Sequence, residues 1–389
     1  MEVFIRALGI FLISILCLPL QGQKRELRTK KSSDFDRIDS IVDHYLIENK
    51  LVGVSIGIVK DGKIYFAKGY GTRESGASKP IDSLTNFLTC SVTKLFTATA
   101  IMQLSEQGKI DITQKLIYYL PGFKMKDNRY IDITIEQMLT HTSGLHWDMK
   151  LKHSPHDSSA LRKLVYSVGN KSLNFAPGTQ FDATKTYSNA AYDILGYVVQ
   201  IISGKQYEDY ISENILLKAN MTYSSLDYQK IPEDRRSFTH ILKGKKVKVG
   251  GIWTENEEHS PSGNLNSCSR DLCYWMLSIL GIHNNPNSLN GIVKGNTLEN
   301  MWKGRHVAPQ NKRVSIGLGC FIKDSEEFGK YYWHVGNNLG FSSTLMIFPE
   351  LNFGITVLSN QKYAEQIVWN KIPFEIIGVL KDDWRKNER

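Results

Sequence analysis

Ser91 and Lys94 form an SxxK pattern at the start of an apolar-periodic segment, 91–107, which predicts a helix. Residues three apart share one helix face, so the Lys94 amine can reach the Ser91 hydroxyl. Unpaired amides in the first turn favour developing negative charge. The pair can therefore act as a nucleophile with a nearby base. A second SxxK match exists at Ser359 and Lys362, and a serine that only caps the helix is the alternative interpretation.

Two further triplets each occur only once in the chain. Tyr187-Ser188-Asn189 is the only YxN sequence, and it stands directly before a predicted helix, 188–202. His334-Val335-Gly336 is the only HxG sequence, at the end of a strand-like run.

With these three triplets the sequence resembles the serine β-lactamase superfamily, in the class C β-lactamase and DD-peptidase branch that includes many esterases and the S12-like peptidases. The family pattern is SxxK, YxN, and Lys or His followed by any residue and Gly. The resemblance extends over about residues 36–380. Further similar stretches are IDITIEQMLTHTSGL (131–145), FAPGTQF (175–181), PSGNLNSCSRDL (261–272) and HVGNNLGFSS (334–343).

The resemblance implies a role for each matching residue. Ser91 would be the acylated nucleophile, Lys94 its hydrogen-bonded amine, and Tyr187 the group that moves protons between nucleophile, leaving group and water. Whether Lys94 or Tyr187 is the base in acylation is disputed in related enzymes, and both remain open here.

The resemblance also implies a set of substrate-binding residues. Asn189 would orient the lysine and the substrate amide. His334 and Gly336 match the first and last positions of the family's third triplet. The backbone amides of Ser91 and Asn337 would form an oxyanion hole, which is usually the largest electrostatic contribution to acyl transfer.

One position departs from the family pattern. Val335 stands where β-lactamases and DD-peptidases typically carry Thr, whose hydroxyl helps to hold a substrate carboxylate. Valine cannot donate that hydrogen bond. His334 in place of Lys points the same way, so the sequence favours neutral esters or amides over β-lactams and D-alanyl peptides.

Other residues could be taken for a second catalytic serine or for a metal site. Gly53-Val54-Ser55-Ile56-Gly57 fits the GxSxG elbow of α/β-hydrolases, but that elbow needs a strand, a turn and then a helix. Here Ser55 is predicted in mid-strand (52–59), followed by a turn and a second strand (63–71). His141 and His146 lack an acidic partner at helical spacing, so a structural role is favoured. The sequence predicts no metal site and no cofactor.

The leading hypothesis is an exported serine hydrolase that acts through a Ser91 acyl-enzyme on a small ester or amide, with cell-wall peptides among the candidate substrates. A non-catalytic penicillin-binding-like sensory or binding protein is the alternative from another class. An α/β-hydrolase that uses Ser55 is the weaker alternative.

Strand-like segments lie at both ends of the chain and helices between them. The strands are predicted at 52–59, 63–71, 314–322, 330–335, 341–348 and 353–359, and helices at 36–49, 188–202, 206–217, 268–280 and about 363–381. This order favours an α+β, β-lactamase-like fold: one antiparallel sheet of N- and C-terminal strands, flanked by helices, with a helical insertion.

The N-terminus has the order of a secretory signal. Arg6 precedes an apolar run, 7–20, that is too short for a comfortable membrane span. We expect a signal peptide at 1–22, a basic flexible segment at 23–35, the hydrolase domain at 36–383 and a tail at 384–389. The mature protein would be periplasmic or secreted and without a membrane span, and an uncleaved anchor is the alternative.

Composition excludes several classes of protein. The 389 residues are 41% hydrophobic and 22% charged, as in ordinary globular proteins and unlike disordered or coiled-coil chains. The net charge of +9 comes mostly from segments 24–31 and 243–248. No motif that fits a groove or stacks bases accompanies them, so no nucleic-acid partner is expected. Apart from Cys17, the cysteines have apolar neighbours and are predicted to be buried free thiols: Cys90, Cys268, Cys273 and Cys320.

Overall fold

The fold is centred on one eight-stranded antiparallel sheet in the order β2-β1-β12-β11-β10-β9-β8-β7. The structure is a computed structural model, and it describes residues 33–146, 157–243, 246–250, 259–287, 291–338 and 340–387. The strands are β1 (Gly53–Lys60), β2 (Lys63–Gly71), β7 (His306–Ala308), β8 (Asn311–Ile316), β9 (Phe321–Ser325), β10 (Gly329–Asn338), β11 (Phe341–Phe348) and β12 (Phe353–Ser359).

The two ends of the chain meet in this sheet, as the sequence predicted. Asp61 and Gly62 both have positive φ, 51° and 74°, which gives the two-residue turn that joins β1 to β2. β1 then pairs antiparallel with β12 from Val54 opposite Ser359 to Lys60 opposite Phe353. The strands that follow the helical insertion therefore complete a sheet begun by the N-terminal hairpin.

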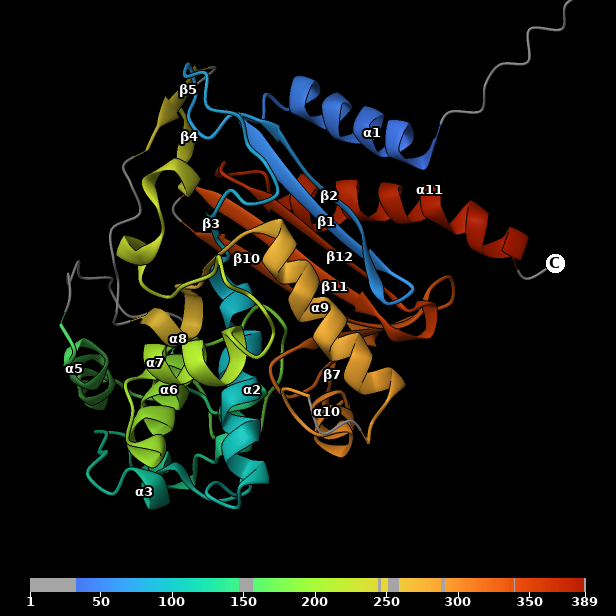
Figure 1. The fold of residues 1–389 in the computed structure, drawn as a ribbon. Coiled ribbons are helices and arrows are strands. Elements are labelled where there is room, and N and C mark those ends of the chain that lie inside the picture. Colours follow the sequence, from blue (N-terminus) through green and yellow to red (C-terminus); the bar gives the residue numbers. More distant parts are fainter. Residues whose placement is uncertain are drawn as a thin grey trace, which may run out of the picture.

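Helices cover both faces of the sheet (Figure 1). On one face α1 (Asp34–Glu48) and α11 (Ile372–Asn387) lie side by side over an apolar layer. α1 begins with a capping box between Ser33 and Asp36. On the other face α9 (Ser269–Asn284) crosses β1 and β12, and α2 (Thr93–Glu106) leads into the helical region.

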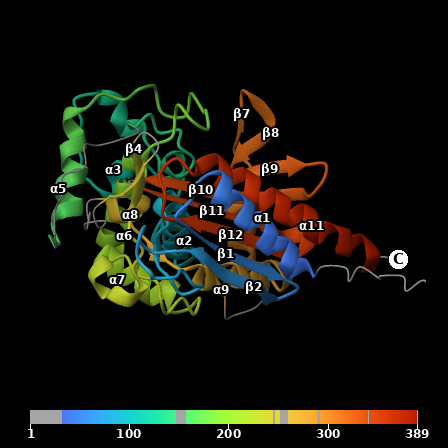
Figure 2. The ribbon, with the colours of Figure 1, turned by 90° about the horizontal axis from the view of Figure 1, so that it is seen from above.

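The helical region packs against α2, at the side of the sheet seen in Figure 2. α2 is buried on almost every side, because α6 and α8 also contact it. The helices of this region are α3 (Leu116–Tyr119), α4 (Ile135–Leu139), α5 (Ala160–Ser167), α6 (Asn189–Ser203), α7 (Tyr207–Ile211) and α8 (Ser260–Gly263). A further short helix, α10 (Gly295–Met301), contacts α9. Two small sheets pair β3 (Phe87–Leu88) with β6 (Asn266–Ser267), and β4 (His240–Lys243) with β5 (Lys246–Val249).

The predicted strand 314–322 was wrong, because two strands occupy that region. The chain leaves β8 at Ile316 and enters β9 at Phe321. Between them Gly319 has a φ of +89°, and a Cβ there would lie 2.3 Å from Ala98 Cβ. A turn that packs directly on α2 therefore interrupts an apolar run that looked continuous.

Three predicted helices differ at their ends. α1 starts at Asp34, inside the segment expected to be flexible. The helix predicted at 206–217 is α7 followed by a π-helical turn, Ser212–Leu216. The C-terminal helix begins with a π-helical turn, Ile367–Lys371, and continues as α11 to Asn387.

Cys90, Cys268, Cys273 and Cys320 are buried free thiols, as predicted. No helix of the described residues is long and apolar enough to cross a membrane. The signal peptide expected at 1–22 and most of the basic segment lie outside the described residues.

Candidate active site

Ser91 lies in a short 3-10 turn, Cys90–Val92, that connects β3 to α2. Cys90 has a φ of 51°, an unfavourable conformation for a residue with a side chain. The N-cap residue of α2 is Val92, and no side chain caps this helix. Ser91 is therefore not a helix cap, and its hydroxyl lines a cavity instead.

Lys94 is fully buried one turn further along the chain. Its Nζ donates to Ser91 Oγ at 3.1 Å, to Asn189 Oδ1 at 2.7 Å and to the Ser262 carbonyl at 2.6 Å. Three oxygens match the three N–H donors of an ammonium group. A buried amine is costly unless it is paired in this way, so the cluster fixes the nucleophile and lysine relative to each other.

The start of α6 carries the second triplet. Ser188 is the N-cap, and its hydroxyl accepts a hydrogen bond from the Ala191 amide at 3.0 Å. Asn189 is therefore the first helical residue, with its side chain at Lys94. Tyr187 directly precedes the cap, so one local motif positions both functional side chains.

The Tyr187 side chain is held by aromatic neighbours. Its ring lies 4.3 Å from the His141 ring between centroids, and Lys94 Nζ lies 4.9 Å from its centroid. His141 Nδ1 accepts the Ser188 amide at 3.1 Å. Burial raises the pKa of the Tyr187 phenol above its ordinary value, and hydrogen bonding with Ser91 offsets part of the shift. The phenol is therefore neutral at rest.

His334 on β10 faces the same cluster. Its ring centroid lies 6.2 Å from that of Tyr187. Burial, and then the charge of Lys94, lower the pKa of His334 to about 3. The ring is thus neutral at physiological pH. Its Nδ1 lies 2.8 Å from the Val335 carbonyl, which can only accept, so Nδ1 carries the proton and Nε2 is an acceptor.

Gly336 allows β10 to approach the turn that carries the nucleophile. A Cβ on Gly336 would lie 2.4 Å from the Thr89 carbonyl oxygen and 2.8 Å from Cys90 Cβ. The side chain of Asn337 is exposed and donates to the carboxylate of Glu365. Trp369 donates its indole N–H to the Gly336 carbonyl at 3.2 Å.

Sequence reasoning missed a second support for Lys94. The Ser262 carbonyl that accepts from Lys94 belongs to α8, and this short helix is tied to α6 by His259 and Asp193. His259 Nδ1 lies 2.6 Å from Asp193 Oδ2, and both side chains are buried. No local sequence pattern predicts this pair, because His259 and Asp193 are far apart in the chain.

This chain resembles known proteins over most of its length. The Beta-lactamase family profile matches residues 38–371. The chain belongs to the Beta-lactamase family. It is 28% identical over 340 residues to Protein flp of Staphylococcus aureus (strain NCTC 8325 / PS 47), covering 85% of this chain and 64% of that relative. The chain thus spans less than two thirds of this relative's length.

Solved structures show the β-lactamase fold again. "A class C beta-lactamase" aligns with a TM-score of 0.75 and 19% identity, over 90% of this chain and 98% of that one. The structure of the octameric penicillin-binding protein homologue from Pyrococcus abyssi aligns with a TM-score of 0.71 and 24% identity, over 85% of this chain and 74% of that one. The predicted family and fold are confirmed.

This β-lactamase-family chain brings the three predicted triplets together around Ser91. Lys94, Tyr187, Asn189, His334 and Gly336 all lie at the cluster described above. The Asn337 side chain turns toward Glu365 instead of toward the cluster. The oxyanion-hole role of the Ser91 and Asn337 backbone amides stays a prediction.

Ser55 has no part in this cluster. It is fully buried in β1, and its hydroxyl bonds Ser269 Oγ at 2.8 Å and the Asp82 carbonyl at 3.3 Å. His146 Nε2 lies 2.6 Å from the Ser172 carbonyl, a structural contact. Among the described residues no group of three or more His, Cys, Asp or Glu side chains is placed to hold a metal ion.

Proposed function

We propose that the protein is an exported serine hydrolase that cleaves uncharged esters or amides through an acyl-enzyme on Ser91. The observation that supports this most is the 3.1 Å contact of the buried Lys94 Nζ with Ser91 Oγ, beside Tyr187. A nucleophile, proton-exchanging groups and a cavity that reaches all of them are the parts that covalent catalysis requires.

In the proposed reaction Ser91 Oγ attacks the carbonyl carbon and forms the new C–O bond. In a concerted relay the neutral Tyr187 phenol gives its proton to the leaving alcohol or amine as the old bond breaks, and it takes the Ser91 proton in the same step. Water then attacks the acyl-enzyme and gives a proton to Tyr187, while Tyr187 gives its own proton to Ser91 Oγ, which releases the acid and free Ser91. The backbone amides of Ser91 and Asn337 are the proposed oxyanion donors.

Lys94 is better suited to support this transfer than to accept the first proton. Three acceptors surround Nζ, which is the arrangement for a charged ammonium group. An ammonium there stabilises the anionic form of a neighbouring phenol or alkoxide. We therefore assign proton exchange to Tyr187 and electrostatic support to Lys94.

Substrate charge is the second part of the proposal. Val335 has no hydroxyl for a substrate carboxylate, and Asn337 is bonded to the Glu365 carboxylate. A carboxylate near the scissile bond would meet an apolar side chain and a like charge. Small neutral esters or amides are thus the proposed substrates, without a nucleic-acid partner. The basic start and apolar run of residues 1–22 are the grounds for proposing export.

Labelling with a fluorophosphonate probe tests the nucleophile. The wild type should be labelled and Ser91→Ala should not, whereas Ser55→Ala should keep the label. A label that survives Ser91→Ala would move the reaction to another serine. A folded wild type that neither takes the label nor turns over any ester would favour the non-catalytic binding protein.

A further inference from the structure

A cavity opens from Ser91 toward the face of the sheet that carries α11. Its volume is about 470 Å³, within the usual range of about 300–1,000 Å³ for ligand sites. On the Ser91 side it is bounded by Tyr187 and His334. It then passes residues from β8, β9, β10, β11 and the C-terminal helix: Val314, Phe321, Lys323, Tyr331, Trp333, Met346, Trp369 and Phe374.

Beside the cavity, β10 extends beyond its neighbour β9. β10 pairs with β9 only as far as Trp333 opposite Phe321, while β10 continues to Asn338. Alternate residues of a strand face opposite sides of the sheet. His334 lines the cavity where it begins at the catalytic cluster, and Trp333 and Val335 line it from the same strand toward the α11 side.

The walls of this cavity are mostly apolar. Trp333 stacks on Phe321 with centroids 4.9 Å apart, and Trp369 is fixed by its bond to the Gly336 carbonyl. Lys323, on β9 opposite Tyr331, adds a cation to the lining. Apolar walls of this size gain free energy by removing apolar ligand surface from water.

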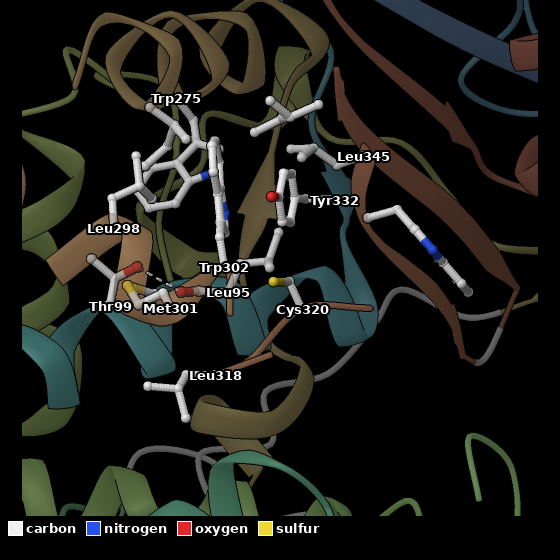
Figure 3. Close-up of a pocket in the computed structure, with 13 residues that line it drawn as sticks. Leu95, Thr99, Trp275, Leu298, Met301, Trp302, Leu318, Cys320, Tyr332 and Leu345 are labelled. Carbon is white, nitrogen blue, oxygen red and sulfur yellow. Dashed lines mark hydrogen bonds between the residues drawn. The ribbon is translucent and has the colours of Figure 1, made fainter. Parts of the chain in front are cut away.

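The opposite side of β10 is packed more tightly. There a cavity of about 30 Å³, close to the volume of one water molecule, lies among side chains of α2, α9, α10 and the sheet. Figure 3 shows Trp302 and Tyr332 next to each other in its lining, where their rings stack with centroids 4.0 Å apart. The cavity beside Ser91 therefore extends along the α11 side of β10, where it can hold a sizeable group.

We infer that the cavity between β8–β11 and the C-terminal helix binds an apolar acyl or alcohol group of an uncharged substrate while Ser91 attacks its carbonyl. This rests on the proposed function and adds the class of substrate: esters or amides with a long aliphatic or aromatic group. Val314, Trp333 and Trp369 would contact that group.

Two ester series test the inference on purified protein, one with the acyl chain lengthened from two to eight carbons and one with the alcohol lengthened likewise. In the wild type, kcat/KM should rise by about 10-fold or more along at least one series, because each methylene in an apolar pocket adds discrimination. Val314→Trp should fill the cavity and abolish that rise, so that kcat/KM no longer depends on chain length in either series.

Val307→Trp is the matched control, because Val307 is exposed on the neighbouring strand and does not line the cavity. Ala183→Leu narrows the cavity from the loop before α6 and serves if Val314→Trp does not fold. Thermal unfolding confirms the fold of each variant.

The outcomes separate the two proposals. If short esters are cleaved but neither series depends on chain length, or if Val314→Trp and Ala183→Leu leave the dependence intact, the apolar site is wrong and the serine hydrolase stands. If no ester is cleaved and no probe labels Ser91, the proposed function itself is wrong. A rise that Val314→Trp removes and Val307→Trp keeps supports the site.

Discussion

The two sides of β10 differ in how their residues are held. On the α2 side, Lys94, Asn189 and His334 have polar partners within hydrogen-bond distance. The cavity of about 470 Å³ begins at Ser91, Tyr187 and His334 and continues on the α11 side, where mostly aromatic and aliphatic side chains line it. Reaction chemistry needs fixed geometry, whereas substrate binding needs a shaped space. One strand supplies both by alternating its side chains.

The largest effect should come from Lys94→Arg. A guanidinium cannot replace a compact ammonium at a site where one nitrogen bonds three oxygens within 3.1 Å. We expect kcat/KM on a short neutral ester to fall by about 10³-fold or more. Lys109→Arg, at an exposed position after the same helix, should leave it unchanged. Activity of Lys94→Arg within about tenfold of wild type would make Lys94 a structural residue only.

Gly336→Ala tests the close approach of β10 to the nucleophile. The new Cβ would lie 2.4 Å from the Thr89 carbonyl oxygen, so the turn carrying Ser91 must move. Displacement of about 1 Å can cost about 10²-fold in rate, and we expect a loss of that order in kcat. Gly281→Ala, on α9, is the control because an added Cβ there would have open space within 4 Å. Equal rates for both variants would contradict the role of Gly336.

Val335→Thr tests substrate charge on the other side of β10. A hydrogen bond from a hydroxyl to a charged acceptor contributes about 1.5–3 kcal/mol of binding free energy. The Glu365 carboxylate, bonded to Asn337, opposes an anionic substrate. We expect the single change to raise kcat/KM for a carboxylate-bearing ester, relative to its neutral analogue, by less than about 10-fold. Adding Glu365→Gln should raise the ratio further. A double variant no better than the single one would remove Glu365 from the explanation.

The smallest effect is expected in acid stability. The pKa of His334 is lowered to about 3 by burial and by Lys94, against about 6.5 in the unfolded chain. Below pH 6.5 the unfolded chain binds a proton that the folded chain does not, so stability falls as pH falls. Between pH 7 and pH 5, His334→Gln should therefore lose about 2 kcal/mol less unfolding free energy than wild type, measured by denaturant titration.

His44→Gln, at an exposed position on α1, is the control for that titration. It should follow the wild-type curve. If His334→Gln loses as much stability as wild type over this pH range, the neutral, buried His334 described here is wrong.

Sequence patterns predicted the α2 side well because its motifs are short. SxxK is one helical turn, and YxN is a helix cap with its neighbours, so local structure alone brings Ser91 to Lys94 and sets Tyr187 beside Asn189. The strands near both ends of the chain were predicted equally well, because turn residues mark their ends in the sequence. The break between β8 and β9 was not, because a glycine turn pressed on α2 depends on tertiary contact.

The α11 side and the α8 support could not be predicted in this way. The cavity takes Val314, Trp333, Met346 and Trp369 from different elements, and each alone is an ordinary core residue. The bond between His259 and Asp193 joins residues that are far apart in the chain. Only the folded arrangement gives such residues a shared role.

Trapping the covalent intermediate tests the proposed function most directly. A slowly deacylating neutral ester would be mixed with the protein, quenched in acid, and followed by intact mass and peptide mapping. The wild type should gain the mass of one acyl group, located on Ser91, and Ser91→Ala should gain none. An acyl group on any other residue, or turnover by a folded Ser91→Ala protein at the wild-type rate, would contradict catalysis through Ser91.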